Sequence, residues 1–351
     1  RRQRQMCIRD RFFLGSGIWV ALSMIGVSAI GMMLFTSRPV GDAMATTIWG
    51  TSSSWTLTAL PLFVWMGEIL FRTKLSENLF KGLSPWMQKL PGGLIHVNVV
   101  GCALFAAISG SSAATVATVG KMSIPELRKR NYPEKILLGS LAGSGTLGLL
   151  IPPSIILIIY GVAVQESIAK LFIAGIIPGI MIALIFMSYV IIWSLINKKS
   201  MPKIIEEYSF FEKIKRSKQL LPVIILILAV IGSIYTGIAT ATEAASLGVV
   251  GALILSYFQK SLTLKTFKSS LLGATKTSCM IAFILAGSTF LSLAMGFTGL
   301  PRNLALWIQN MELSPYVLIF VLMIFYIILG MFLDGISAVV LTMAIIEPMI
   351  R

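Results

Sequence analysis

The sequence is poor in the side chains from which most catalytic and metal centres are built. It contains one histidine, three cysteines and 14 acidic residues among 351. Cys7, Cys102 and Cys279 form neither a metal-binding pattern nor a disulfide framework, and His96 stands alone at the start of an apolar stretch. Without clusters of such ligands, a metalloenzyme is disfavoured. The sequence also has no P-loop, which argues against an ATP-driven pump.

Charge is scarce as well. Only 12% of the residues are charged, against about a quarter in soluble domains, while 56% are hydrophobic and the mean hydropathy is +0.88. A membrane-spanning helix needs about 20 mostly apolar residues. Such stretches occur at about 12–35, 55–71, 94–120, 136–165, 171–196, 219–258, 269–297 and 314–350. We therefore predict an all-α polytopic membrane protein with about eight to eleven helical segments.

The formal net charge of +15 has a topological explanation. Lysine and arginine gather in short loops at 121–135, 198–218 and 260–268. Single crossings by the apolar stretches between them would place all three loops on one side, and basic loops are typical of the cytoplasmic side. The charge therefore predicts membrane orientation and does not indicate nucleic-acid binding.

Glycine interrupts three of the apolar stretches, first at Ser109, Gly110, Ser111 and Ser112. Glycine can break a helix, and a break exposes a carbonyl end that attracts cations and an amide end that attracts carboxylates. The hydroxyls of Ser111, Ser112 and Thr115 could bind a hard ion such as sodium. The alternative is close helix packing through small residues.

A second interruption contains Gly330, Asp334, Gly335 and Ser337. A carboxylate inside an apolar run is costly, so Asp334 is a functional candidate by default. An anionic oxygen beside a helix break would suit a sodium ion. The alternative is a structural pairing of Asp334 with a buried donor.

The third interruption runs from Gly145 and Thr146 to Pro152 and Pro153. Glycine and paired proline exclude a continuous helix, and the freed carbonyls need a cavity or another protein segment as partner. All three interruptions lack lysine and arginine. An anionic substrate would then be held by amides, hydroxyls and a bound cation.

Two further carboxylates lie at or within apolar stretches. Glu243, in the string Thr240–Ala241–Thr242–Glu243, is interpreted mainly as a helix cap. Glu68 follows Gly67 within a predicted span, and a structural role and a functional role fit its position equally well.

Several strings in the chain resemble the large membrane subunit, the DctM-like subunit, of the tripartite ATP-independent periplasmic (TRAP) transporters. They extend from about residue 45 to the end, in the family's order. The strings are ALPLFVWMGEILF (59–71), LFAAISGSSAATVATVG (104–120), GTLGLLIPPSI (145–155), LFIAGIIPG (171–179), TATEAASLG (240–248) and GMFLDGISAVVLTM (330–343). At Ala241 the chain departs from the family, which often has proline before the Thr-Glu pair.

The resemblance implies a secondary carrier and not an enzyme. The expected fold has ion-transporter-like inverted repeats with broken helices and re-entrant hairpins, and it works by an elevator motion. The expected activity is sodium-coupled uptake of a small organic anion, such as a C4-dicarboxylate or sialic acid. A periplasmic binding protein would deliver the anion, and a small, Q-type membrane subunit would be the second partner in the bacterial inner membrane. No cofactor is expected beyond sodium as coupling ion, held at Ser111, Ser112 and Asp334.

The expected organisation is one transmembrane transporter domain over 12–351, with repeat-like halves at about 55–130 and 275–351. The basic segment 1–11 is interpreted as a non-native or disordered tail, and the end at Arg351 as a truncation. Two alternatives stay open. One is a related sodium/carboxylate carrier that needs no binding protein. The other is a membrane-embedded enzyme, for which no nucleophile–base pair is evident near 109–112.

Overall fold

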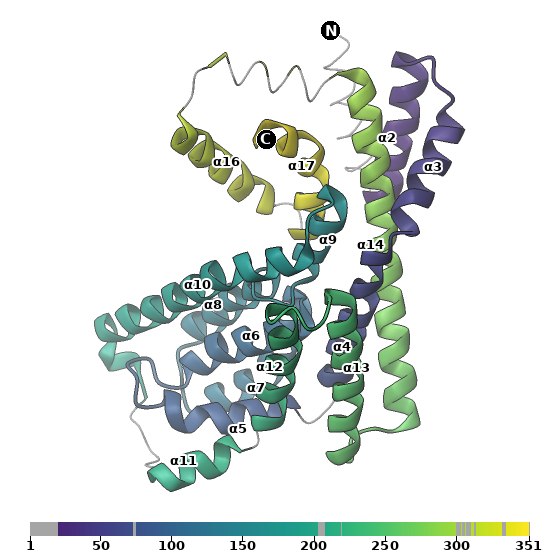
Figure 1. Ribbon diagram of the computed structural model, residues 1–351. Helices are drawn as coiled ribbons and strands as arrows, with labels where there is room; N and C mark the ends of the chain where they lie inside the picture. Colours follow the sequence, from purple (N-terminus) through teal and green to yellow (C-terminus); the bar gives the residue numbers. More distant parts are fainter. Residues whose placement is uncertain are drawn as a thin grey trace. The chain divides into compact units, whose positions relative to one another are not determined.

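The computed structural model describes residues 20–72, 75–202, 208–218, 220–299, 303, 306, 310–311, 314–331 and 335–350. Every regular element in these ranges is helical (Figure 1). The first half contains α2 (Val20–Phe35), α3 (Val40–Ser52), η1 (Trp55–Thr58), α4 (Ala59–Phe71), α5 (Leu75–Met87), α6 (Ile95–Ser109), α7 (Ser112–Lys129), α8 (Glu134–Gly145), η2 (Thr146–Leu149) and α9 (Ile155–Val164). The second half contains α10 (Ile168–Ile196), η3 (Lys198–Ser200), α11 (Phe210–Ser217), α12 (Leu221–Tyr235), α13 (Ala241–Phe258), α14 (Leu264–Thr298), α16 (Pro315–Gly330) and α17 (Gly335–Ile350).

The all-helical prediction is confirmed for the described residues, but the apolar stretches are divided more finely than expected. Three of the described helices, α10, α13 and α14, are long and apolar enough to cross a membrane, or up to five spans if bent helix pairs are counted as one. Glycine and proline divide other stretches, such as 94–120, into shorter helices. Several apolar helices of a multi-pass membrane protein are thus present.

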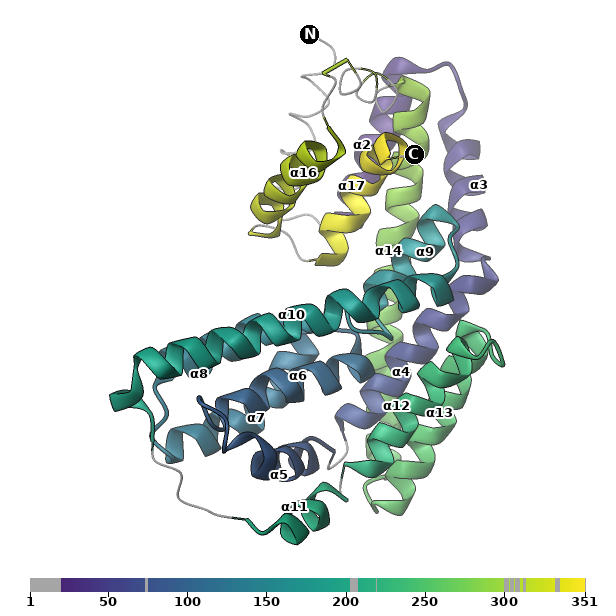
Figure 2. The same cartoon turned by 60° about the vertical axis from the view of Figure 1, so that its left-hand side comes forward.

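The chain divides into two compact units. The second unit comprises Thr58–Ile158 and Glu166–Thr277, and the first unit comprises the described residues of the remaining chain. Within the second unit, α4, α12 and α13 pack side by side, while α6, α7, α8 and α10 form a neighbouring group (Figures 1 and 2). The core of this group contains Ile95, Val99, Ala106, Ile136, Leu147 and Val190.

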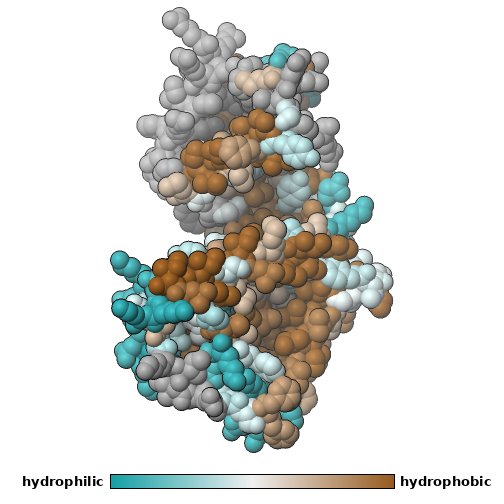
Figure 3. All heavy atoms as spheres, turned by 90° about the vertical axis from the view of Figure 1, so that its left-hand side faces the viewer, coloured by the Kyte–Doolittle hydropathy of each residue, from teal (hydrophilic) through white to brown (hydrophobic). Residues whose placement is uncertain are grey.

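Helix α10 exposes much of its apolar surface. Its exposed side chains include Ile177, at 78%, and Ile196, at 76%, together with several others along its length. Figure 3 shows hydrophobic side chains over much of the coloured part of one face. A soluble protein rarely exposes contiguous apolar patches of such size, whereas a lipid-facing helix does so along its whole length.

Helices α6 and α7 form a hairpin, and a hydrogen bond joins its two ends on the side away from the Gly110 turn. The hydroxyl of Tyr132, just after α7, accepts a hydrogen bond of 3.0 Å from the backbone N–H of Leu94, just before α6. A Cβ at Gly93 would lie 2.5 Å from that hydroxyl oxygen, and Gly93 has a φ of +54°. Glycine is thus required where the two ends of the hairpin meet.

Helix α13 begins with a capping box, as its sequence predicts. The Glu243 carboxylate accepts hydrogen bonds of 2.8 Å from the backbone N–H and from the hydroxyl of Thr240. In return, the Thr240 hydroxyl accepts from the Glu243 backbone N–H. The interpretation of Glu243 as a helix cap is confirmed, and its carboxylate needs no functional explanation.

The first unit contains α2, α3, α16 and α17, together with the C-terminal part of α14. Met32, Phe290 and Ala294 form a small buried cluster. The hydroxyls of Tyr326 and Thr342 lie 2.7 Å apart and join α16 to α17. This contact holds together α16 and α17, the two helices on either side of the Gly330–Gly335 interval.

Candidate functional site

The first predicted break lies between α6 and α7. Helix α6 ends at Ser109 and α7 begins at Ser112. Gly110 takes up the left-handed conformation, with a φ of +57°, and Ser111 is extended. A Cβ at Gly110 would lie 2.9 Å from Cγ1 of Ile155 and 3.0 Å from its backbone nitrogen. Backbone conformation and space therefore both require glycine at this position.

Two helix ends of opposite partial charge meet at this break. The carbonyl end of α6 carries a partial negative charge, and the amide end of α7 carries a partial positive charge. The Ser111 hydroxyl caps α7 by accepting from the backbone N–H of Ala114 at 3.5 Å. The amide end is the kind of site that binds carboxylates, and the carbonyl end is the kind that binds cations.

The hydroxyls near the break differ in their bonding. The buried Thr115 hydroxyl donates to the backbone carbonyl of Ser111 at 2.8 Å, so its proton is used within the helix. The Ser112 hydroxyl oxygen is buried and has no hydrogen-bond partner among the described residues. A buried polar atom without a partner is costly, and a bound ion would relieve that cost. Ser112 is therefore the strongest ligand candidate here.

The third predicted break packs against the first. Helix α8 ends at Gly145, and Leu150–Ser154 separates η2 from α9. A Cβ at Gly148 would lie 3.3 Å from the carbonyl carbon of Ser111, and one at Gly145 would overlap Cγ2 of Val116. Another protein segment, one of the two kinds of partner expected, thus packs against this break.

The other residues predicted in the third break are buried or hydrogen-bonded to nearby backbone. Pro152 and Pro153 are buried, and the carbonyl oxygen of Pro153 would lie 3.3 Å from a Cβ at Gly110. Thr146 is exposed and donates to the backbone carbonyl of Gly143 at 2.7 Å. The structure thus brings Gly110, Gly145 and Pro153 together, and it leaves the Thr146 side chain bound to its own helix.

A cavity of about 150 Å³ adjoins the first break. Its lining comes from four segments of the second unit: Val64, Gly67, Glu68 and Phe71 of α4, Ser111 and Ala114 at the start of α7, Ile155, and Thr277 of α14. At about 30 Å³ for each water molecule, this volume corresponds to about five waters. Pockets for drug-sized molecules usually measure about 300–1,000 Å³, so this space suits a hydrated ion better than an organic anion.

Glu68 is the residue that sequence reasoning did not select. Its Oε2 accepts from Arg72 at 2.9 Å, and Arg72 also donates to the Ser269 hydroxyl. A Cβ at Gly273 would lie 2.6 Å from the same Oε2, so glycine leaves room for the carboxylate. The available signal was a carboxylate in an apolar span. Its position beside Ser111 could not be read from that signal.

The second predicted break is partly described. Helix α16 ends at Gly330 and α17 begins at Gly335, so the expected interruption of the apolar run is confirmed. Ser337 is buried near the start of α17. Asp334 lies outside the described residues. Gly330, Gly335 and Ser337 belong to the first unit, whereas Gly110 belongs to the second.

The described residues contain no group of three or more histidine, cysteine, aspartate or glutamate side chains that could hold a metal ion together. His96 is buried, and its Nε2 lies 2.7 Å from the carbonyl oxygen of Pro91. It therefore has a structural role at the start of α6.

Comparison with known proteins decides the family. The family model described as "Tripartite ATP-independent periplasmic transporter, DctM component" matches residues 12–351. The chain belongs to this family. The resemblance seen in the sequence is thereby confirmed.

Several relatives among the TRAP large permeases differ in their substrates. The C4-dicarboxylate permease protein DctM of Pseudomonas aeruginosa is 33% identical, over 91% of this chain and 74% of its own length. The sialic acid permease protein SiaM of Vibrio cholerae is 30% identical, over 95% and 78%. The 2,3-diketo-L-gulonate permease protein YiaN of Escherichia coli is 30% identical, over 98% and 80%.

As a TRAP large permease, the chain is a membrane transport subunit and not an enzyme. This agrees with the exposed apolar helices of the second unit. The family is one component of a tripartite system, which works with a small membrane subunit and a periplasmic binding protein.

Proposed function

We propose that this TRAP large permease carries out sodium-coupled uptake of a small organic anion, and that the Gly110 break is part of its ion site. The observation that supports this most is the buried, unpartnered Ser112 hydroxyl at the junction of two helix ends. Ser111 and Glu68 line a cavity of ion size at the same junction. Hydroxyls, carbonyls and carboxylates are the oxygen ligands that hard cations prefer.

Charge explains why a cation would be needed with the anion. Among the described residues, the cavity is lined by the Glu68 carboxylate and by no lysine or arginine, and Arg72 pairs with that carboxylate from outside the lining. A carboxylate substrate would gain from the amide end of α7. A sodium ion bound beside the substrate would attract its carboxylate, so sodium and anion would bind more tightly together than apart. Asp334 is proposed as a sodium ligand from the corresponding break between α16 and α17.

The proposed substrate is a small carboxylate. The relatives named for C4-dicarboxylates, sialic acid and 2,3-diketo-L-gulonate support this class, because all three molecules carry a carboxylate. The proposed partners are a small membrane subunit, a periplasmic binding protein and the anion it delivers. The proposed location is the bacterial inner membrane. The proposed fold contains inverted repeats, and the proposed transport mechanism is an elevator movement.

The experiment is uptake into proteoliposomes containing this chain, its small membrane subunit and its binding protein. Replacing sodium by choline at fixed membrane potential should abolish uptake, and Asp334→Asn should raise the sodium concentration required. Undiminished uptake in choline would refute sodium coupling. Robust uptake by this chain without the binding protein would identify it as a binding-protein-independent carrier instead.

A further inference from the structure

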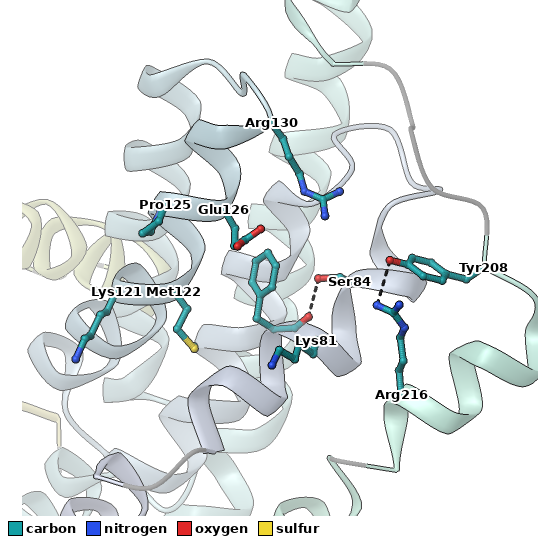
Figure 4. Close-up of a pocket in the computed structure, with 10 residues that line it drawn as sticks. Lys81, Ser84, Lys121, Met122, Pro125, Glu126, Arg130, Tyr208 and Arg216 are labelled. Atoms are coloured by element: carbon teal, nitrogen blue, oxygen red, sulfur yellow. Dashed lines mark hydrogen bonds between the residues drawn. The ribbon is translucent and has the colours of Figure 1, made fainter.

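A second pocket, of about 440 Å³, lies in the second unit at the end of α7 opposite the Gly110 break. Its lining contains Phe80, Lys81, Ser84, Lys121, Met122, Pro125, Glu126, Arg130, Tyr208 and Arg216. The lining thus contains four cationic side chains and one carboxylate. Figure 4 shows Arg130 and Glu126 extending toward the centre of this group, with Lys121 and Arg216 at opposite edges.

Two of the four cations have no partner among the described residues. Lys81 and Lys121 make no hydrogen bond or ion pair within the described part of the chain. Arg216, by contrast, donates to the Tyr208 hydroxyl at 3.1 Å and lies 4.2 Å from the centre of that ring. The excess of positive charge favours an anionic ligand, and arginine and lysine are the usual donors to phosphate.

Helix α11, which contributes Arg216, is strongly amphipathic. Phe210 and Phe211 are 69% and 78% exposed, while the other face carries Lys213 and Arg216. The Trp86 ring holds α11 against α5: its Nε1 donates to the Ser217 hydroxyl at 2.7 Å, and it packs edge-on against Phe210. An amphipathic helix with exposed phenylalanine and a basic face lies in the membrane interface.

We propose that this pocket binds the phosphate headgroup of an anionic phospholipid, whose acyl chains cover the exposed phenylalanine face of α11. The basic lining matches the headgroup charge, and the adjacent apolar face matches the chains. A free organic anion would bind the basic lining but would not contact the apolar face of α11. Much of the lining comes from the basic segments 121–135, which includes the end of α7, and 198–218, which includes α11; charge assigns both segments to the cytoplasmic side. The cytoplasmic leaflet is the one rich in anionic lipid.

The test is lipid binding by the purified full chain, measured by native mass spectrometry in detergent. Phosphatidylglycerol should bind more tightly than phosphatidylcholine. Lys81→Gln with Lys121→Gln should weaken phosphatidylglycerol binding about 5-fold for each charge removed, and hence about 25-fold together. The matched control is Lys265→Gln with Lys268→Gln, because both lysines are exposed, lie in the basic segment 260–268 at the start of α14 and are absent from the pocket lining. This control should bind as the unmodified chain does.

Two further measurements separate a lipid from a soluble anion. Phe211→Ser should weaken phosphatidylglycerol binding while leaving all four pocket cations in place. Glycerol 3-phosphate, the headgroup without acyl chains, should not displace the lipid even in large molar excess. Displacement by glycerol 3-phosphate, equal binding of both lipids, or an equal loss in the control variant would each overturn the proposal. If the double variant does not fold, Lys121→Gln alone should still show the 5-fold loss.

Discussion

Removing the Ser112 hydroxyl should have opposite effects on stability and on sodium binding. The oxygen is buried and has no hydrogen-bond partner among the described residues, and an unsatisfied buried polar group costs about 1–3 kcal/mol. Ser112→Ala removes that cost and places a good helix former in the first turn of α7. Without sodium, the variant should therefore be at least as stable as the unmodified chain.

Sodium binding should become weaker in the same variant. If Ser112 is a sodium ligand, the variant loses a bond comparable to a hydrogen bond to a charged group, about 1.5 kcal/mol or more. Since about 1.4 kcal/mol is a factor of ten in affinity, the sodium concentration for half-maximal uptake should rise about tenfold. The assays are thermal unfolding in detergent without sodium and sodium-titrated uptake in proteoliposomes.

The same helix supplies a matched control. Ser123 of α7 also has a buried hydroxyl oxygen without a partner among the described residues, but it lies about three turns from the break. Ser123→Ala should match Ser112→Ala in stability and leave the sodium requirement unchanged. An unchanged sodium requirement in Ser112→Ala, or the same change in both variants, would refute the ion site and favour packing of small residues.

Three further substitutions test other parts of the reasoning. Gly110→Ala should lower the free energy of unfolding by about 1–2 kcal/mol or more, seen as a lower melting temperature, because its φ is positive and a Cβ would press on Ile155. Glu68→Gln should raise the sodium requirement of uptake about tenfold with little loss of stability, because its ion pair is partly exposed; an unchanged requirement would remove Glu68 from the site. Thr240→Ala should cost about 1 kcal/mol of stability through loss of the capping box with Glu243, without altering sodium dependence; a sodium effect would contradict a purely structural cap.

Local features of the fold could be predicted because local residue chemistry determines them. Gly110 predicted the end of α6, and the paired prolines after Gly145 predicted the interruption between α8 and α9. The string from Thr240 to Glu243 predicted a cap, since a capping box needs only two residues three positions apart. These features depend on neighbours in sequence, and the structure confirms each of them.

Features that depend on distant residues could not be predicted in this way. The cavity beside Ser111 requires Glu68, Ile155 and Thr277 to meet, and no periodicity in the sequence specifies that meeting. The same limit applies to the basic pocket, where Lys81 and Arg216 come from helices that are far apart in the chain. The apolar stretches also did not predict the helix Val40–Ser52, because this segment contains too many polar residues.

The bond between Tyr132 and Leu94 limits how the α6–α7 hairpin can deform. It joins the residue before α6 to the turn after α7, so the two helices cannot separate at that end. The opposite end, at Gly110, packs against the segment between α8 and α9: a Cβ at Gly110 would lie 2.9 Å from Ile155, and one at Gly148 would lie 3.3 Å from Ser111. The hairpin is therefore held at both ends, and any displacement of the Gly110 turn would have to be shared by Gly148 and Ile155.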